Sequence, residues 1–227
     1  MKKCVVLSGS GISAPSGIAT FRAGDGLWNG HRVEEVATPE AWARDPAKVL
    51  QFYNERRAQL DEVVPNSGHQ ALAQLEDHFE VCIVTQNVDD LHERAGSSHV
   101  IHLHGELKKA RSSTHESLVY EIGTKPIELG DRCEQGSQLR PHIVWFGEVP
   151  FQYFESCQYT READVFIVVG TSLQVYPAAG LVNEVSRECQ CFHVDPDSKN
   201  APLGFETIAE SADQGLPKLV SQLIDTL

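Results

Sequence analysis

Three short segments of this 227-residue chain combine residue types that could do chemistry on a dinucleotide. The loop 8–14 reads SGSGISA and follows an apolar run, so the backbone at Gly9 and Gly11 could approach a pyrophosphate, with a following helix end adding positive potential. The segment 85–89, TQNVD, follows a second apolar run, and His102 and His104 lie in a third. An imidazole has an ordinary pKa of about 6.5, which suits a general base. Together these segments predict a dinucleotide pocket that contains a base.

Each motif alone also has a structural interpretation. A glycine-rich turn can be a tight turn with no role in binding, and a histidine in an apolar strand is commonly a packed core residue. Asn87 and Asp89 could simply end a strand in an Asx turn, but they follow a predicted parallel strand, where ligands bind in such sheets. The conjunction therefore favours function. His102 is expected to be structural, as a packed histidine of the apolar strand.

Short apolar runs alternate with helical patterns along the chain, which is typical of an α/β fold with a parallel sheet. Their continuous hydrophobicity predicts strands that are covered on both faces. The predicted strands are Cys4–Leu7, Val81–Thr85, Val100–Leu103, His142–Trp145, Val165–Val169, Cys191–Val194 and Glu206–Ile208. The predicted helices are Asp45–Val63, Ser67–Phe79, Phe151–Ala163, Pro177–Cys189 and Leu216–Leu227.

Two stretches interrupt this alternation and predict a small inserted module. Residues 31–65 are helical and charged, whereas residues 108–139 are polar and carry turn-forming glycines. We therefore expect one catalytic domain over 1–227, with a Rossmann-like parallel sheet and helices on both faces. Its core would come from 1–30, 66–107 and 140–227, and the small module from 31–65 and 108–139.

Composition and charge exclude several classes of partner. A formal net charge of −13 would repel a nucleic-acid backbone or an anionic membrane surface, so we expect neither as a partner. No apolar run approaches the roughly 20 residues that a membrane span needs. The six cysteines are scattered, which does not suggest a disulfide framework. A short apolar amino-terminal run that meets the glycine loop early predicts a buried strand and a cytoplasmic protein.

These residues resemble the sirtuin family of NAD-dependent protein deacylases. The resemblance rests on the loop 9–13, on TQNVD at 85–89 and on His104-Gly105. Further matches are RPHIVWFGE at 140–148 and GTSLQVYPAAG at 170–180, so motifs in the family's order cover nearly the whole chain.

The resemblance implies a reaction in which the acyl oxygen of a modified lysine attacks the anomeric carbon of the nicotinamide ribose. Nicotinamide, free lysine and an O-acyl-ADP-ribose would be the products. The implied catalytic residues are His104 as general base, Asn87 at the ribose or a water, and Asp89 at the nicotinamide carboxamide. Phe21 would shield the sugar and Arg22 would lie near the phosphates. The implied NAD-binding residues are Gly9, Ser10, Gly11, Ile12, Ala14, Thr20, Phe21, Arg22, Trp28, Gln86, Asn87, Val88, Asp89, Gly170, Thr171, Ser172, His193, Val194, Asp195 and Ala212.

The acyl class is indicated by the helical segment FYNERR at 52–57. Residues three apart share a helix face, so Tyr53 and Arg56 could point into one pocket, where a guanidinium beside a phenol suits a carboxylate. A solvated helix face with Tyr53 partly buried is the structural alternative. The pair resembles that of class III sirtuins, which remove succinyl and other acidic acyl groups, with Ala37 matching the small residue that enlarges their pocket.

We therefore expect removal of both acetyl and succinyl groups from acylated lysine-containing proteins. The implied substrate-binding residues are Ala37, Tyr53, Arg56, Val144, Phe146, Gly147, Glu148 and Val175.

The chain departs from the family at the metal. Many sirtuins fold the small module around four cysteines that hold zinc, whereas residues 108–139 keep only Cys133, with His115 as a distant partner. We expect NAD as the cofactor and no metal. A second departure is His193, where the family usually has asparagine.

Other functions for the same pocket remain open. An ADP-ribosyltransferase or an NAD hydrolase could use it with a different nucleophile. A dehydrogenase would not require the group formed by Asn87, Asp89 and His104. A non-catalytic NAD-binding module is disfavoured, because all the expected catalytic residue types are present.

Overall fold

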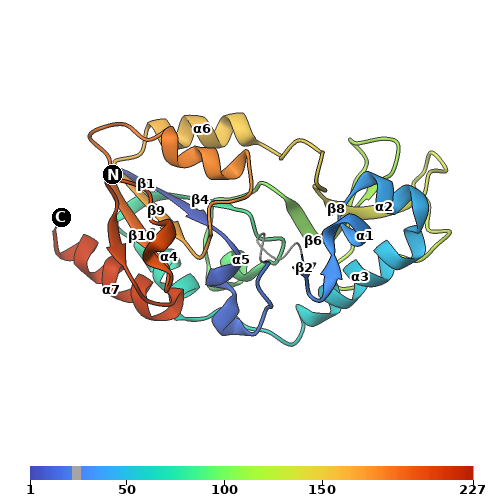
Figure 1. The fold of residues 1–227 in the computed structure, drawn as a ribbon, viewed down its shortest axis with the longest axis horizontal. Coiled ribbons are helices and arrows are strands. Elements are labelled where there is room, and N and C mark those ends of the chain that lie inside the picture. The colour runs from blue at the N-terminus through green and yellow to red at the C-terminus, as the bar shows by residue number, and fades with distance from the viewer. Residues whose placement is uncertain (22–26, 227) are drawn as a thin grey trace.

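A parallel sheet forms the centre of the larger part of the molecule (Figure 1). The computed structural model describes residues 1–21 and 27–226. Within them the sheet has six strands in the order β11-β10-β9-β1-β4-β5. Their bounds are β1 Lys2–Ser8, β4 Phe79–Thr85, β5 Val100–His102, β9 Val165–Val169, β10 Gln190–Val194 and β11 Glu206–Ile208. The apolar β1 lies between β4 and β9, so the motifs that follow these three strands meet at one edge.

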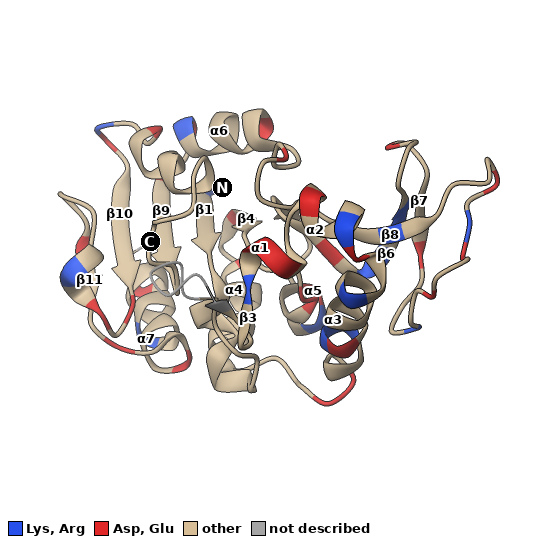
Figure 2. Ribbon diagram, turned by 45° about the vertical axis from the view of Figure 1, so that its right-hand side comes forward, with Lys and Arg blue, Asp and Glu red and all other residues tan. Residues whose placement is uncertain are grey.

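Helices cover both faces of this sheet (Figure 2). Alternate strand residues pack on one face against α4 (Ser67–Leu75) and the amphipathic α7 (Ala212–Asp225). The other face packs against α6 (Tyr153–Arg161) and a 3₁₀ segment, Ala178–Asn183. A short α5 (Leu91–Ala95) follows β4. The predicted Rossmann-like α/β fold with an inserted module is confirmed.

A smaller part, at the right of Figure 1, is built on an antiparallel sheet in the order β7-β6-β8. Its strands are β6 Gly105–Ser112, β7 Val119–Glu121 and β8 Leu139–Ile143, so this sheet reaches beyond the predicted boundaries at 108 and 139. Three helices pack on it, α1 Val33–Val36, α2 Pro39–Arg44 and α3 Pro46–Gln59. The hairpin of β2 (Leu27–Trp28) and β3 (His31–Arg32) adjoins α3.

Several predicted elements differ in extent from the observed ones. Helix α3 begins as predicted, with Asp45 accepting from the Lys48 backbone N–H at 3.0 Å and proline at the first helical position. The helix predicted over 177–189 was wrong, because only the 3₁₀ segment forms there; Gly180 lies in its middle and lowers helix propensity. The strand predicted over 142–145 corresponds to β8, which lies at 139–143 and belongs to the small antiparallel sheet. Helix α7 begins four residues earlier than predicted, at Ala212.

A helix end behind the glycine loop was also a wrong expectation. The chain forms two 3₁₀ turns there, Ser10–Ile12 and Ala14–Ser16. Pro15 has no N–H to donate and the flanking glycines favour other conformations, so a regular helix does not form. In the described part of the chain, every helix is too short or too polar to cross a bilayer.

Candidate functional site

A cavity of about 660 Å³ opens between the two parts of the molecule. The ends of β1, β4, β9 and β10 form one wall, through Gly9, Gln86, Gly170 and Val194. The small module contributes the opposite wall, including Ala37, Tyr53 and the segment 143–148. In open parallel sheets, ligands bind in this position, outside the carboxyl ends of the strands.

Gly9 and Gly11, after β1, allow the loop after β1 to pack closely against the loop after β9. A side chain at Gly9 would place its Cβ 2.7 Å from the Gly170 carbonyl oxygen, and one at Gly11 would place it 2.6 Å from the Gly170 Cα. The N–H groups of Gly9 and Gly11 donate to the carbonyls of Val169 and Gly170. These two N–H groups are therefore already bonded, and glycine here brings the loops after β1 and β9 together at the cavity wall.

A hydroxyl group joins the two polar residues after β4. The buried Ser13 Oγ donates to Asp89 Oδ2 at 3.0 Å and accepts from Asn87 Nδ2 at 3.1 Å. The Leu91 backbone N–H donates to the other carboxylate oxygen, Oδ1, at 3.1 Å. Asn87 and Asp89 are thus held in fixed orientations, as a preorganised binding site requires.

Burial sets the charge state of Asp89. Desolvation raises the pKa of this carboxyl to about 6, although the hydrogen bonds from Leu91 and Ser13 lower it. At neutral pH the ionised form is therefore the major one, and it is retained by two hydrogen bonds. A carboxylate in this setting can accept a hydrogen bond from a ligand amide.

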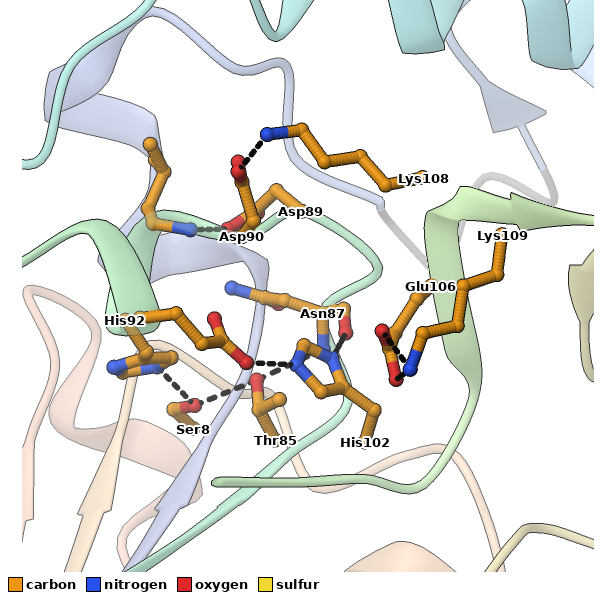
Figure 3. A network of polar contacts seen from close by, with 12 residues as sticks. Ser8, Thr85, Asn87, Asp89, Asp90, His92, His102, Glu106, Lys108 and Lys109 are labelled. Atoms are coloured by element: carbon orange, nitrogen blue, oxygen red, sulfur yellow. Dashed lines mark hydrogen bonds and ion pairs between the residues drawn. The ribbon is translucent and has the colours of Figure 1, made fainter. Parts of the chain in front are cut away.

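The two histidines after β4 bond to neighbouring backbone carbonyls but have different surroundings. His102 Nδ1 donates to the Asn87 carbonyl at 3.0 Å, and its Nε2 lies 2.6 Å from Glu93 Oε1; Figure 3 shows it beside Asn87. Although burial lowers the pKa of His102, the hydrogen bond and charge of Glu93 outweigh it, so the pKa is raised overall. The pair of His102 with Glu93, together with the bond to the Asn87 carbonyl, supports the loop after β4.

The tautomer of His104 follows from its hydrogen-bond partner. Its Nδ1 lies 3.1 Å from the Gln86 carbonyl, which can only accept, so Nδ1 carries the proton and Nε2 is the basic nitrogen. Burial lowers the pKa of His104, which keeps the ring neutral at working pH. His104 lines the large cavity together with Asn87 and Asp89.

Behind the loop after β4, the network contains a further buried pair of histidines. His92 Nε2 lies 2.9 Å from Ser8 Oγ, which bonds to Thr85 Oγ1 at 2.8 Å, and Figure 3 shows these three together. His69 stacks edge-on against His92, and its Nε2 lies 3.5 Å from Ser13 Oγ. Desolvation lowers the pKa of both rings, so both are neutral.

The small module provides an apolar end to the cavity. Tyr53 is fully buried and its hydroxyl accepts from the Trp145 indole N–H at 3.1 Å. Ala37 and Tyr53 both line the cavity. Arg56, one helical turn further on, lines instead a neighbouring cavity of about 30 Å³. The structure thus brings Ala37 and Tyr53 together at the large cavity, whereas Arg56 lies in the adjoining small cavity.

Two buried arginines hold the segment that closes the cavity. Arg111 and Arg140 both bond to Glu148, the latter at 2.7 Å, and their charges keep the pKa of the Glu148 carboxyl low against the effect of burial. Glu148 also accepts from the Trp145 backbone N–H at 2.8 Å. The turn 145–148 at the cavity wall is therefore tied to the small sheet.

Around Cys133, in the segment where many sirtuins hold zinc, hydrogen bonds hold the chain. Cys133 Sγ donates to Ser112 Oγ at 3.5 Å, and Ser112 Oγ accepts from the backbone N–H groups of Thr114 and His115. Among the residues with described positions, no three His, Cys, Asp or Glu side chains are grouped as metal ligands would be.

Most of the residues that the sequence pointed to line the large cavity. Three of them do not: Ile12 is packed in the core, His193 is buried in β10, and Arg56 lines the smaller cavity. Arg22 lies outside the described residues. The cavity-lining residues among the predicted set are Gly9, Ser10, Gly11, Ala14, Thr20, Phe21, Trp28, Ala37, Tyr53, Gln86, Asn87, Val88, Asp89, His104, Val144, Phe146, Gly147, Glu148, Gly170, Thr171, Ser172, Val175, Val194, Asp195 and Ala212.

Sequence reasoning missed several lining residues and one organising hydroxyl. Ser13 lies inside the glycine loop, and its buried position between Asn87 and Asp89 requires the fold to become visible. Tyr176, inside the motif at 170–180, and Pro150, just after the motif at 140–148, also line the cavity although neither was among the predicted site residues. Asn29 and Gly30 form an Asn-Gly pair, which is a hairpin signal that could have been recognised.

Fold and cavity together define an α/β protein with a large ligand cavity at the ends of its parallel strands, lined by a neutral histidine. Residues 9–177 match the family model described as Sir2 family. An NAD-dependent protein deacylase from Helicobacter pylori is 52% identical over 227 residues, with 99% of each chain covered, and one from Bacteroides thetaiotaomicron is 48% identical, again with 99% of each covered. A solved Sir2 homolog–NAD complex is 40% identical, with a TM-score of 0.88 over 99% of this chain and 90% of that one. The chain belongs to the Sir2 family, and its predicted identification as a sirtuin deacylase is confirmed.

Proposed function

We propose that this NAD-dependent protein deacylase removes both acetyl and succinyl groups from protein lysines, with His104 as the general base. The observation that supports this most directly is the neutral imidazole at the cavity, whose Nδ1–H is held by the Gln86 carbonyl. A general base needs its proton-accepting nitrogen unprotonated at the working pH.

The residues present fit NAD. The wall formed by the strand ends is built from glycines and small polar residues, including Ser10, Thr171 and Ser172, which suit phosphates and ribose hydroxyls. Asp89, ionised at neutral pH and fixed by Ser13, would accept from the nicotinamide carboxamide, and Asn87 would orient a ribose hydroxyl. When bound, NAD supplies the electrophilic sugar carbon to which the acyl group is transferred. The chain itself would orient the sugar and take up a proton at His104.

Acylated lysine-containing proteins are the proposed substrates. A Sir2 protein that is 31% identical to this chain has been solved bound to a myristoylated histone peptide, with a TM-score of 0.75. The exposed Phe146 and Tyr176 at the rim of the cavity give an apolar surface for a peptide to contact.

Acceptance of succinyl groups rests on the small module. Ala37 leaves room beside the buried Tyr53, and Arg56 lies in a cavity that shares the walls Trp28 and Val88 with the large one. A guanidinium can hold a carboxylate through two charge-assisted hydrogen bonds.

Matched acetyl-lysine and succinyl-lysine peptides test this assignment. Changing Arg56 to Met should cut desuccinylation by about tenfold or more and spare deacetylation, because only the acidic acyl group needs the cation. Arg44→Met, at an exposed position of α2, is the control. Equal losses of both activities in the Arg56 variant would contradict the acyl assignment.

An ADP-ribosyltransferase or NAD hydrolase is the alternative for the same pocket. NAD consumption without any change in the acylated peptide, or transfer of label from NAD to protein, would favour that alternative.

We also propose that the small module needs no zinc. Its turns are held by the Ser112 and Cys133 contact and by the bonds of Glu148 to Arg111 and Arg140. Stoichiometric zinc in the purified protein would contradict this.

A further inference from the structure

The guanidinium of Arg56 is already engaged. Its Cζ lies 3.7 Å from the centroid of the Phe52 ring, and its Nη1 donates to the Phe52 carbonyl at 2.5 Å. Glu55 Oε2 lies 3.3 Å from the same Nη1. The side chain is only 11% exposed, so water does not compete freely for its donors.

The opposite edge of the guanidinium faces Asn29. With the Asn29 amide oriented so that its oxygen meets the donors, Oδ1 accepts from Arg56 Nη2 at 2.7 Å and from Nε at 3.2 Å. Nη2 and Nε form one of the two forks through which arginine binds a carboxylate. The amide oxygen of Asn29 therefore occupies the place of one carboxylate oxygen.

Backbone geometry keeps Asn29 in this place. Asn29 has a φ of +52° and Gly30 a φ of +79°, so both central residues of the hairpin between β2 and β3 adopt the left-handed conformation that a type I′ turn requires. Asparagine tolerates this conformation better than most residues. The turn fixes the Asn29 backbone directly across from α3.

The cavity at this contact is small beside the large one, about 30 Å³ against about 660 Å³, and Asn29 is one of its lining residues. It shares five lining residues with the large cavity, namely Ile18, Ala19, Trp28, Val88 and Asp89. An acidic acyl chain that enters from the large cavity would therefore meet the Nε and Nη2 donors of Arg56 already bonded to Asn29.

We infer that Asn29 is a specificity-determining residue, whose amide competes with the acyl carboxylate for the Nε and Nη2 donors of Arg56. This inference rests on the proposed acceptance of succinyl groups. It places the discrimination between acidic and neutral acyl groups in the hairpin turn as well as in the helix that carries Arg56.

Two substitutions at this position should act in opposite directions. Asn29→Gly keeps the positive φ and empties the fork, so the KM for a succinyl-lysine peptide should fall by about fivefold, which corresponds to one hydrogen bond. Asn29→Asp places a permanent carboxylate in the fork, so that KM should rise by about tenfold. Deacetylation and debutyrylation should stay within about twofold in both, because neutral acyl groups do not use the guanidinium.

The matched control is Gln59→Ala, since Gln59 lines the same small cavity and bonds to the Gly17 carbonyl rather than to Arg56. Opposite shifts for the two Asn29 variants, confined to the succinyl peptide, support the inference. It is overturned when wild type desuccinylates and neither variant changes the ratio of the two activities. If wild type deacetylates but does not desuccinylate, the proposed succinyl activity is wrong. In that case, gain of desuccinylation in Asn29→Gly still supports competition by the Asn29 amide, and absence of such a gain overturns the inference.

Discussion

The hydroxyl of Ser13 offers the sharpest test of how the site is organised. Replacing Ser13 by Ala removes the donor to Asp89 Oδ2 and the acceptor for Asn87 Nδ2 in one step. A hydrogen bond to a charged group contributes about 2 kcal/mol, which corresponds to about 30-fold in kcat/KM for NAD. Because the Ser13 bond lowers the pKa of Asp89, its loss moves that pKa further above about 6.

The assay measures kcat/KM for NAD as a function of pH with a saturating acetyl-lysine peptide. The variant should lose activity, and the acidic limb of its profile should move to higher pH, since in the proposed function it is ionised Asp89 that holds the carboxamide. Ser16→Ala is the matched control, because Ser16 lies in the same loop and bonds to Asn66 instead. A variant with lowered activity but an unshifted profile would refute this account of Ser13 and Asp89.

Three further predictions concern the frame of the site. Gly170→Ala should lower the free energy of unfolding by more than about 2 kcal/mol, because Gly170 has a φ of +62° and its Cβ would meet backbone at 2.4 Å. Gly123→Ala, with a φ of +60° but open space around it, should cost clearly less in the same urea titration, and equal losses would contradict the packing argument. Glu93 raises the pKa of His102 above 6.5, so in wild type the pair stabilises the fold below pH 6.5, and this stabilisation is lost as pH rises through the folded pKa. Glu93→Gln should abolish this pH-dependent part of the free energy of unfolding. Denaturant titrations at pH 5.5 to 8.5 check this, and parallel pH curves for the two proteins would count against the pair. Dialysis against a strong zinc chelator should leave the unfolding midpoint unchanged, and a lowered midpoint would show that the small module depends on metal.

The sheet was largely predictable because its strands are continuous apolar runs. The observed bounds of β9 are the predicted ones, and β1 and β4 differ by a few residues at their ends. The N-cap Asp45 followed by Pro46 gave the start of α3 by local chemistry alone. Elements whose pattern is not periodic were missed, above all β6, where the strand runs along the small sheet through the mixed sequence GELKKARS.

The site was predictable in composition but not in its contacts. Motifs at the strand ends indicated Asn87, Asp89 and His104, because the topology of a parallel sheet brings such ends together. The placement of Arg56 depends on the Asn29 turn, which lies outside its own motif, and on the position of the Phe52 ring, which the motif does not give. The role of Ser13 depends on side-chain directions at two strand ends, which spacing does not give.

The measurement that tests the central claim most directly is mass spectrometry of reactions that contain NAD and an acetyl-lysine or a succinyl-lysine peptide, with wild type beside His104→Ala. Wild type should yield the free-lysine peptide, nicotinamide and an O-acyl-ADP-ribose, and the variant should yield none of the O-acyl-ADP-ribose. Full retention of the product by His104→Ala, or consumption of NAD by wild type with both peptides unchanged, would contradict a deacylase that uses His104 as its base.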